Sequence, residues 1–333
     1  MTASRAPAVE PSEGPVPALP AQTALPPSPA ATASDASPPT SAASVAFGAY
    51  VHGAPWSSEP LDAFEASIGR PLAIVMWYQT WGAGGASRFD PAMMDRAGAR
   101  GAMPLLTWVP SAEQVPAFTL RDVLAGRHDT YIRDFARAAA AWGRPFMLRP
   151  LHEMNGDWHV WSPAINGNTA GEYVAVWRHV YALFAAEGAS NVLWVWSPNT
   201  YVGRTGISLA SVYPGDEFVD WVALDGYNRG SSSAWSRWHS FTEEFGASYD
   251  TVTRLTSRPM MIAETASCEE GGNKAEWVRS ALTEEIPSRF PLVKAVIWFN
   301  QRKECDWRVD SSPEVLAAMT RAVALPNYSG IVP

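Results

Sequence analysis

The chain has 333 residues, 47% of them hydrophobic, and a formal net charge of −8. This length and composition allow one large domain with a substantial core. The negative balance argues against a nucleic-acid partner, which would need clustered Lys and Arg. No run of about 18 apolar residues indicates a membrane span. The 16 Trp residues predict either a bulky core or a site made of flat aromatic faces, which suit sugar rings.

The first 44 residues differ in composition from the rest. Residues 1–44 contain ten Pro and no Trp, Tyr, Phe or Lys. Such a segment cannot bury enough apolar surface to offset its ordering entropy, so we expect a disordered linker rich in Pro, Ala and Ser. No secretory signal peptide is visible before it. We expect a signal that has been removed, a start further upstream or another export route.

From residue 45 to residue 333, short apolar runs alternate with amphipathic stretches. Strands are predicted at residues 46–51, 72–77, 102–108, 146–152, 192–196, 219–224, 259–264 and 295–299. Helices are predicted at residues 61–68, 91–99, 130–142, 170–187, 241–255, 275–284 and 313–323, with a weaker helical pattern at 208–213. Eight strand-then-helix units predict an α/β fold of the (β/α)8 TIM-barrel type. The competing doubly wound sheet lacks its Gly-x-Gly-x-x-Gly sequence after the first strand.

Two carboxylates lie at strand ends of this predicted barrel. Glu153 follows the fourth strand and Glu264 closes the seventh, so the two should face each other across the carboxyl-terminal rim. Cleavage of a glycosidic bond uses such a pair, one as acid and the other as nucleophile or base. The alternative for each is a structural ion pair with an arginine such as Arg149 or Arg302.

Other chemistries find less support in the sequence. The segment that begins at His152-Glu153 carries Gly156 where a zinc-peptidase helix needs its second His, and His159 has the wrong spacing. Cys268 and Cys305 are too far apart in sequence for a metal-binding cysteine cluster. We therefore expect no metal and no cofactor. The two cysteines should lie on one rim, where a disulfide and two free thiols remain open alternatives.

Four sequence blocks carry a family resemblance. They are residues 149–156 (Arg-Pro-Leu-His-Glu-Met-Asn-Gly) with Trp158, residues 222–228, residues 261–264, and residues 296–300 with 306–308. In this order they resemble glycoside hydrolase family 26. The resemblance implies a retaining mechanism with Glu153 as acid/base and Glu264 as nucleophile, their carboxyls about 5–5.5 Å apart. It also implies a raised pKa for Glu153.

The resemblance further assigns substrate contacts. Tyr227 would donate a hydrogen bond to Glu264, and His152 would contact Glu264 or the sugar before the scissile bond. Trp298 would form the floor of that subsite, and Trp158 would stack on the leaving-group side. Further candidates for sugar contacts are Trp108, Gln79 and Asn300.

The implied substrate is a β-linked polysaccharide or oligosaccharide, with endo-β-1,4-mannanase activity favoured. Mixed-linkage β-1,3-1,4-glucanase (lichenase), β-1,3-xylanase and exopolysaccharide hydrolase activities are the alternatives within the family. The loop at residues 300–308 departs from typical mannanases. A carbohydrate-binding surface protein without catalysis is the remote alternative. We expect a monomer that works outside the cell or at its surface.

Overall fold

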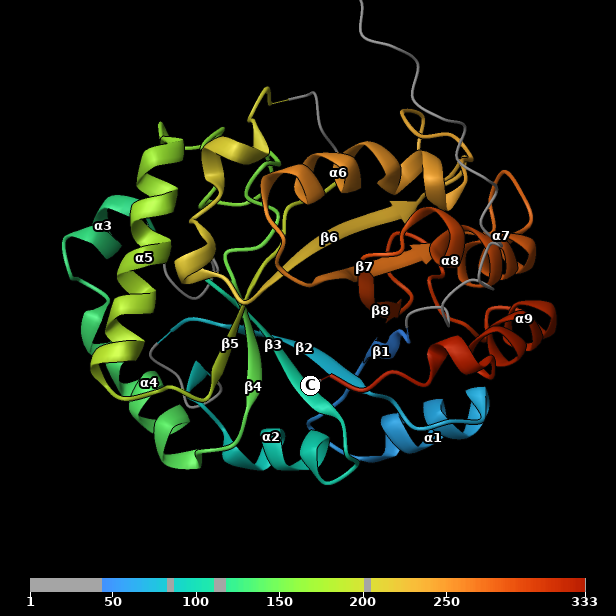
Figure 1. The fold of residues 1–333 in the computed structure, drawn as a ribbon, viewed down its shortest axis with the longest axis horizontal. Coiled ribbons are helices and arrows are strands. Elements are labelled where there is room, and N and C mark those ends of the chain that lie inside the picture. The colour runs from blue at the N-terminus through green and yellow to red at the C-terminus, as the bar shows by residue number, and fades with distance from the viewer. Residues whose placement is uncertain (1–43, 83–86, 111–117, 201–204, 333) are drawn as a thin grey trace, which may run out of the picture. The chain divides into compact units, whose positions relative to one another are not determined.

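The computed structural model describes residues 44–82, 87–110, 118–200 and 205–332, so the predicted linker falls almost entirely outside the described residues. Eight parallel strands in the described part form a closed barrel in sequence order, which confirms the predicted TIM-barrel fold (Figure 1). The strands are β1 Ala46–Val51, β2 Ile74–Thr80, β3 Met103–Val109, β4 Phe146–Pro150, β5 Val192–Trp196, β6 Trp221–Asn228, β7 Met260–Ser267 and β8 Val293–Asn300.

Helices surround the strands and cover the outer face of the barrel (Figure 1). They are α1 Glu59–Ile68, α2 Pro91–Gly98, α3 Leu120–Leu124, α4 Asp129–Trp142, α5 Ala170–Ala186, α6 Phe241–Leu255, α7 Lys274–Ser280, α8 Ile286–Arg289 and α9 Pro313–Val323. A π-helical turn at Ala281–Glu285 joins α7 to α8, and the fifth connection forms 3-10 turns at Leu209–Val212 and Asp216–Phe218. In the described part of the chain, no helix combines the length and apolar character that a bilayer crossing requires.

Helix starts follow local capping chemistry. Thr169 and Ser240 each accept a hydrogen bond from the backbone at the third helical position, and a Glu at that position bonds back to the cap. These capping boxes fix where α5 and α6 begin. Ser312 caps α9 ahead of Pro313, whose missing N–H costs nothing in the first turn.

The strands are buried on both faces, which explains their continuous apolar sequences. Inside the barrel, Gly48 of β1 leaves room for the side chains of Ile74 and Ile297. A Cβ atom at residue 48 would lie 2.7 Å from Cβ of Ile74. The interior becomes polar only towards the carboxyl-terminal ends of the strands, where Arg149, Asp225 and Glu264 are buried.

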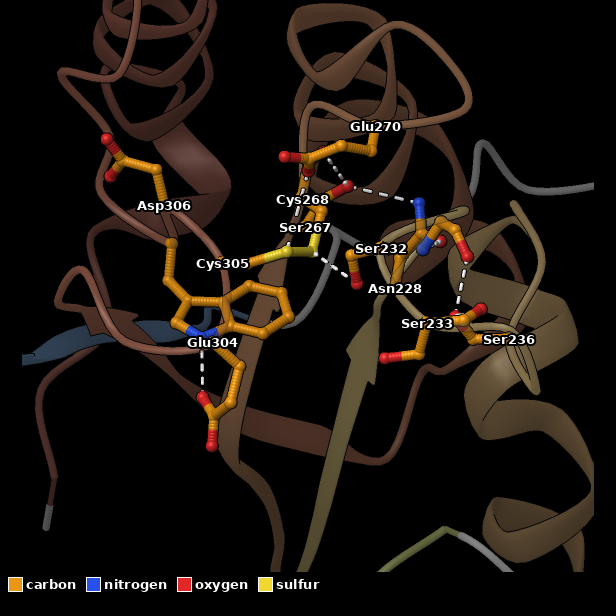
Figure 2. The surroundings of a disulfide bond; sticks show 12 residues. Asn228, Ser232, Ser233, Ser236, Ser267, Cys268, Glu270, Glu304, Cys305 and Asp306 are labelled. Carbon is orange, nitrogen blue, oxygen red and sulfur yellow. Dashed lines mark hydrogen bonds between the residues drawn. A yellow bond between two sulfur atoms is a disulfide. The ribbon is translucent and has the colours of Figure 1, made fainter.

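Two connections hold the loops that follow β7 and β8. Cys268 and Cys305 form a disulfide with a Cα–Cα distance of 5.6 Å, beside Ser232 and Glu270 (Figure 2). Lys274, at the start of α7, is fully buried. Its Nζ donates to the carbonyls of Asp306 and Arg308 and to Oγ of Ser311 at 2.7–3.0 Å. The loop after β8 is therefore fixed covalently and by a buried ammonium group.

Candidate active site

The chain turns sharply as soon as β4 ends. The strand stops at Pro150, two residues before its predicted end, and Leu151 and Glu153 both adopt left-handed backbone conformations (φ 49° and 51°). Such conformations are uncommon for residues other than Gly and concentrate at functional sites. The backbone N–H of Glu153 donates to the carbonyl of Ser197 at 2.7 Å, which ties this turn to the end of β5.

Two side chains donate to the Glu153 carboxylate. Nδ2 of Asn199 donates to one oxygen and Nε1 of Trp158 to the other, each at 2.7 Å. Asn199 is itself fixed, because its backbone N–H and carbonyl bond to the amide side chain of Asn155. Gly156 allows the indole of Trp158 to approach, since a Cβ at residue 156 would lie only 2.4 Å from it. Asn199 and Trp158 thus fix the orientation of the Glu153 carboxylate.

Glu264 lies in β7 and receives three donors. Arg149 and the hydroxyls of Tyr78 and Tyr227 all donate to its carboxylate. The expected hydrogen bond from Tyr227 to Glu264 is therefore present in the structure. Charge-assisted bonds of this kind are short and strong. They hold the Glu264 carboxylate in one orientation, with a permanent positive charge against it.

Arg149 organises the base of the site. Its side chain is fully buried, and it bonds to Asp225 at 2.8 Å and to Oγ1 of Thr107 at 2.9 Å as well as to Glu264. Ser197 donates to Asp225 at 2.9 Å. One guanidinium therefore serves two buried carboxylates. Removing either partner of such a buried pair leaves an uncompensated charge, at a cost of about 3–5 kcal/mol.

The two glutamates share one electrostatic site. Burial raises the pKa of Tyr227 well above its ordinary value, and the charges of Glu264 and Glu153 add to the increase. Burial and the charge of Glu264 likewise raise the pKa of Tyr78. Both phenols therefore stay protonated and remain hydrogen-bond donors. Glu153 lies just past the end of β4 and Glu264 lies in the carboxyl-terminal half of β7, so both lie towards the same rim of the barrel.

The pKa of Glu153 differs from the expectation. Burial by itself raises this pKa, whereas His159 and the hydrogen bonds from Asn199 and Trp158 lower it, and the net pKa lies below its ordinary value. The expected raised pKa is therefore wrong for the protein without substrate. We ascribe the lowering chiefly to the two well-aligned donors, because Nε2 of His159 lies 3.5 Å from the carboxylate and makes no hydrogen bond.

Four residues predicted to contact sugar lie elsewhere. Trp108 and Trp298 have no exposed surface and face the helices, with Trp108 packed on Phe135 and Trp298 near Trp277. The side chain of Gln79 donates to the carbonyl of Arg88. That of Asn300 accepts from the N–H of Val309 at 2.8 Å. The reason is strand parity, because each of these residues follows or precedes an inward-facing neighbour.

The inward-facing neighbours form the aromatic lining instead. Phe299 stacks on Tyr50 at 4.7 Å and meets Tyr227 edge-on at 5.8 Å. Trp307, from the loop after β8, packs on Tyr227 at 5.0 Å. Tyr78 and Asn199, which donate to the two glutamates, were not among the predicted site residues. The register between β7 and β8 shifts between Ile262 and Thr265, so that Thr265 and not Glu264 lies beside Trp298.

His152 lies beside the acid with two other rings from the same loop. It is buried, and its ring lies 5.9 Å from Tyr78 and 4.7 Å from His159. His159 stacks on Trp161 at 4.2 Å. Burial, followed by the charge of Arg149, holds the pKa of His152 well below its ordinary value. His152 is therefore a neutral imidazole. Trp158 is 45% exposed and is the open face of the site.

Comparison with known proteins finds a matching family model and two similar curated proteins. The model of glycosyl hydrolase family 26 matches residues 128–285. Endoglucanase H of Acetivibrio thermocellus is 37% identical over 284 residues, which is 84% of this chain and 30% of the relative. Mannan endo-1,4-beta-mannosidase A and B of Caldalkalibacillus mannanilyticus is 35% identical over 165 residues, which is 48% of this chain and 29% of the relative. The chain thus spans less than a third of either relative.

A solved structure shares the fold. The catalytic domain of a GH26 endo-beta-1,4-mannanase from Bacillus sp. JAMB-750 superposes with a TM-score of 0.65 at 18% identity. The superposition covers 86% of each chain. The solved structure therefore has the same barrel fold as this chain.

Proposed function

Because the chain belongs to glycoside hydrolase family 26, we propose that it is a retaining endo-β-glycanase that uses Glu264 as nucleophile and Glu153 as acid/base. The observation that carries the proposal is the different treatment of the two carboxylates. Glu264 is fixed by Arg149 and two phenols, whereas Glu153 borders the half-exposed Trp158. A rigidly held carboxylate suits attack on carbon, and a carboxyl beside the open face of the site suits proton transfer.

The mechanism follows from these contacts. Glu264 attacks the anomeric carbon, while Glu153 gives its proton to the leaving oxygen and later takes one from water. Tyr227 donates a hydrogen bond to the Glu264 carboxylate, so it orients this group for attack on the anomeric carbon. A sugar that covers Trp158 and excludes water from Glu153 favours the protonated acid, because burial raises a carboxyl pKa.

The first candidate substrate is a β-1,4-mannan, the activity named for the Caldalkalibacillus relative. A β-glucan is the second candidate, because the relative that aligns over 84% of this chain is named an endoglucanase. The loop at residues 300–308, which departs from typical mannanases, carries Trp307 against Tyr227. Sugar specificity would therefore be set partly by this loop.

The sequence-based expectations of a catalytic domain at residues 45–333, a monomeric state and a location outside the cell complete the proposal. A disulfide between the two cysteines supports an oxidising location, where such bonds persist.

The decisive experiment combines substrate screening with variants. Purified protein is assayed on mannan, glucomannan, barley β-glucan and β-1,3-xylan, and the anomer released is followed by NMR. We expect Glu153→Ala and Glu264→Ala each to lower kcat by several orders of magnitude with unchanged circular dichroism. Azide should restore turnover of an activated aryl glycoside by Glu153→Ala. Inversion at the anomeric carbon, or near-normal activity in either variant, would overturn the assignment.

A further inference from the structure

Three potential metal ligands meet in the loop after β4. His152, Glu153 and His159 each offer one ligand atom, and these atoms all lie within 4.8 Å of one another. The spacing of the two histidines in sequence does not match a zinc-peptidase helix. The turn at Leu151 and Glu153 nevertheless folds the loop back so that His159 reaches the other two residues. The three side chains are therefore close in space although their spacing in sequence is not that of a zinc-peptidase motif.

Two buried nitrogen atoms of this group make no hydrogen bond. Nδ1 of His152 and Nε2 of His159 are both buried and make no hydrogen bond. The whole His152 residue is 6% exposed. A buried polar atom without a partner costs about 1–3 kcal/mol, so native proteins rarely keep one without a reason. Two such nitrogens beside one carboxylate indicate that the group accommodates a ligand.

The chemistry of the donors selects the ligand. Two imidazoles and one carboxylate form the donor set of catalytic zinc sites, which leave a fourth position open. Two ligands bound to a tetrahedral zinc at about 2.0–2.2 Å lie roughly 3.3–3.6 Å apart. Nε2 of His159 lies 3.5 Å from Oε2 of Glu153. The pair therefore has the separation that zinc requires, and His152 must close the remaining distance. Ca²⁺ and Mg²⁺ prefer oxygen ligands and fit this donor set poorly.

The surrounding residues support such a site. The ring of His159 stacks on the buried Trp161 with an interplanar angle of 12°. Nε1 of Trp161 donates to the carbonyl of His152 at 2.8 Å, so one indole orients both histidines. The side chain of His159 keeps 23% of its surface exposed, and Trp158 beside it is half-exposed. An ion can therefore enter from solvent.

We propose that His152, Glu153 and His159 bind one divalent cation of the zinc class, and that the bound cation blocks the Glu153 carboxylate. Metal binding stands on the geometry alone. The inhibition that follows from it rests on the proposed function, because it requires Glu153 to be the acid/base.

Isothermal titration of the full chain with zinc chloride tests the binding step. We expect one site in the wild type and at least tenfold weaker binding in His159→Gln, whose folding is checked by circular dichroism. His179→Gln is the matched control, because His179 pairs with a carboxylate, Asp129, on the outer helices. That variant should bind zinc as the wild type does. Equal zinc affinity in the wild type and His159→Gln, or no binding by the wild type, would refute the site.

Activity measurements test the second step. Zinc should inhibit hydrolysis reversibly, with recovery after chelation, and magnesium should not. Inhibition in His159→Gln should need at least tenfold more zinc. Binding without inhibition would refute the blocking of Glu153. A chain that hydrolyses no polysaccharide would refute the proposed function, while the titration would still decide whether the metal site exists.

Discussion

Glu153 holds a conformation that its own backbone does not favour. Its φ of 51° places a residue with a Cβ in the left-handed region, at a cost on the order of 1–3 kcal/mol. The bonds to Ser197, Asn199 and Trp158 offset that cost. The position of the acid therefore depends on residues from the β4 and β5 loops together.

Because Glu264 accepts hydrogen bonds from three donors, loss of one donor should lower the catalytic rate without abolishing it. Tyr227→Phe removes one hydrogen bond to a charged group, worth about 1.5–3 kcal/mol, while it keeps the ring that packs on Trp307. We expect kcat/KM to fall roughly 10- to 150-fold, with the fold retained by circular dichroism. Tyr181→Phe, in the helix layer against Trp194, is the matched control. An unchanged kcat/KM in Tyr227→Phe would show that this bond does not matter for catalysis.

At the residue scale, prediction from sequence depended on where strands end. Glu153 and Glu264 could be found because a carboxylate directly after an apolar run is unusual. Trp298 and Trp108 were misplaced because an aromatic residue near a strand end suits either the barrel interior or the helix layer. Buried strands without alternation hide which residues face inward. The register between β7 and β8 also shifts between Ile262 and Thr265, so the inward position of Glu264 does not carry over to β8 by counting.

At the scale of elements, the loops after β7 and β8 act as one unit. The disulfide joins them at Cys268 and Cys305, and Lys274 fixes the second loop through the carbonyls of Asp306 and Arg308. Nε1 of Trp298 donates to the carbonyl of Trp307 at 2.9 Å. The misassigned tryptophan thus supports the aromatic lining from behind, without touching the rim itself.

The buried Lys274 makes the unfolding free energy of the protein depend on pH. Burial lowers the pKa of Lys274 from 10.5 to about 8, against the opposing charges of Glu269 and Asp306. Between these two values the unfolded chain binds more protons than the folded one, so Lys274 makes the unfolding free energy rise with pH. The rise totals a few kcal/mol at most, at about 1.4 kcal/mol per pKa unit.

Denaturant unfolding of the wild type and Lys274→Met from pH 7 to 10.5 measures this effect. The wild type should gain stability relative to the variant above about pH 8. Parallel stability curves across that range would mean that Lys274 keeps an ordinary pKa.

Element boundaries show what sequence patterns miss. All eight predicted strands exist. The fourth ends two residues before its predicted end, because the chain turns at Leu151 in a left-handed conformation that no Gly in the sequence marks. The short helix α3 was not predicted, because five residues present too little periodicity to stand out. The weak helical pattern at residues 208–213 corresponds to a 3-10 turn.

At the scale of the whole molecule, the C-terminal segment completes the barrel next to its first strand. Val45 exchanges backbone hydrogen bonds with Asn327 and Gly330. Tyr328 is fully buried, meets Phe47 edge-on at 6.3 Å and donates to the carbonyl of Leu282 at 2.8 Å. The start and the end of the described domain are therefore packed together.

Tyr328 should contribute strongly to global stability. Tyr328→Ala leaves a cavity and should lower the unfolding free energy by about 3–5 kcal/mol. Tyr328→Phe keeps the ring and loses one hydrogen bond, for about 1 kcal/mol. Urea unfolding of both variants measures the two values. If the Ala variant were as stable as the Phe variant, the segment would not be packed as described.

The disulfide also makes part of the chain a covalent ring. The bond between Cys268 and Cys305 closes a loop with a sequence separation of 37, and that loop contains α7, α8 and the whole of β8. A protease that cuts once inside this ring breaks the polypeptide but releases no fragment. The two pieces stay joined until a reductant reaches the sulfur atoms. The last barrel strand is thus retained by a covalent link even when its peptide connection to β7 is lost.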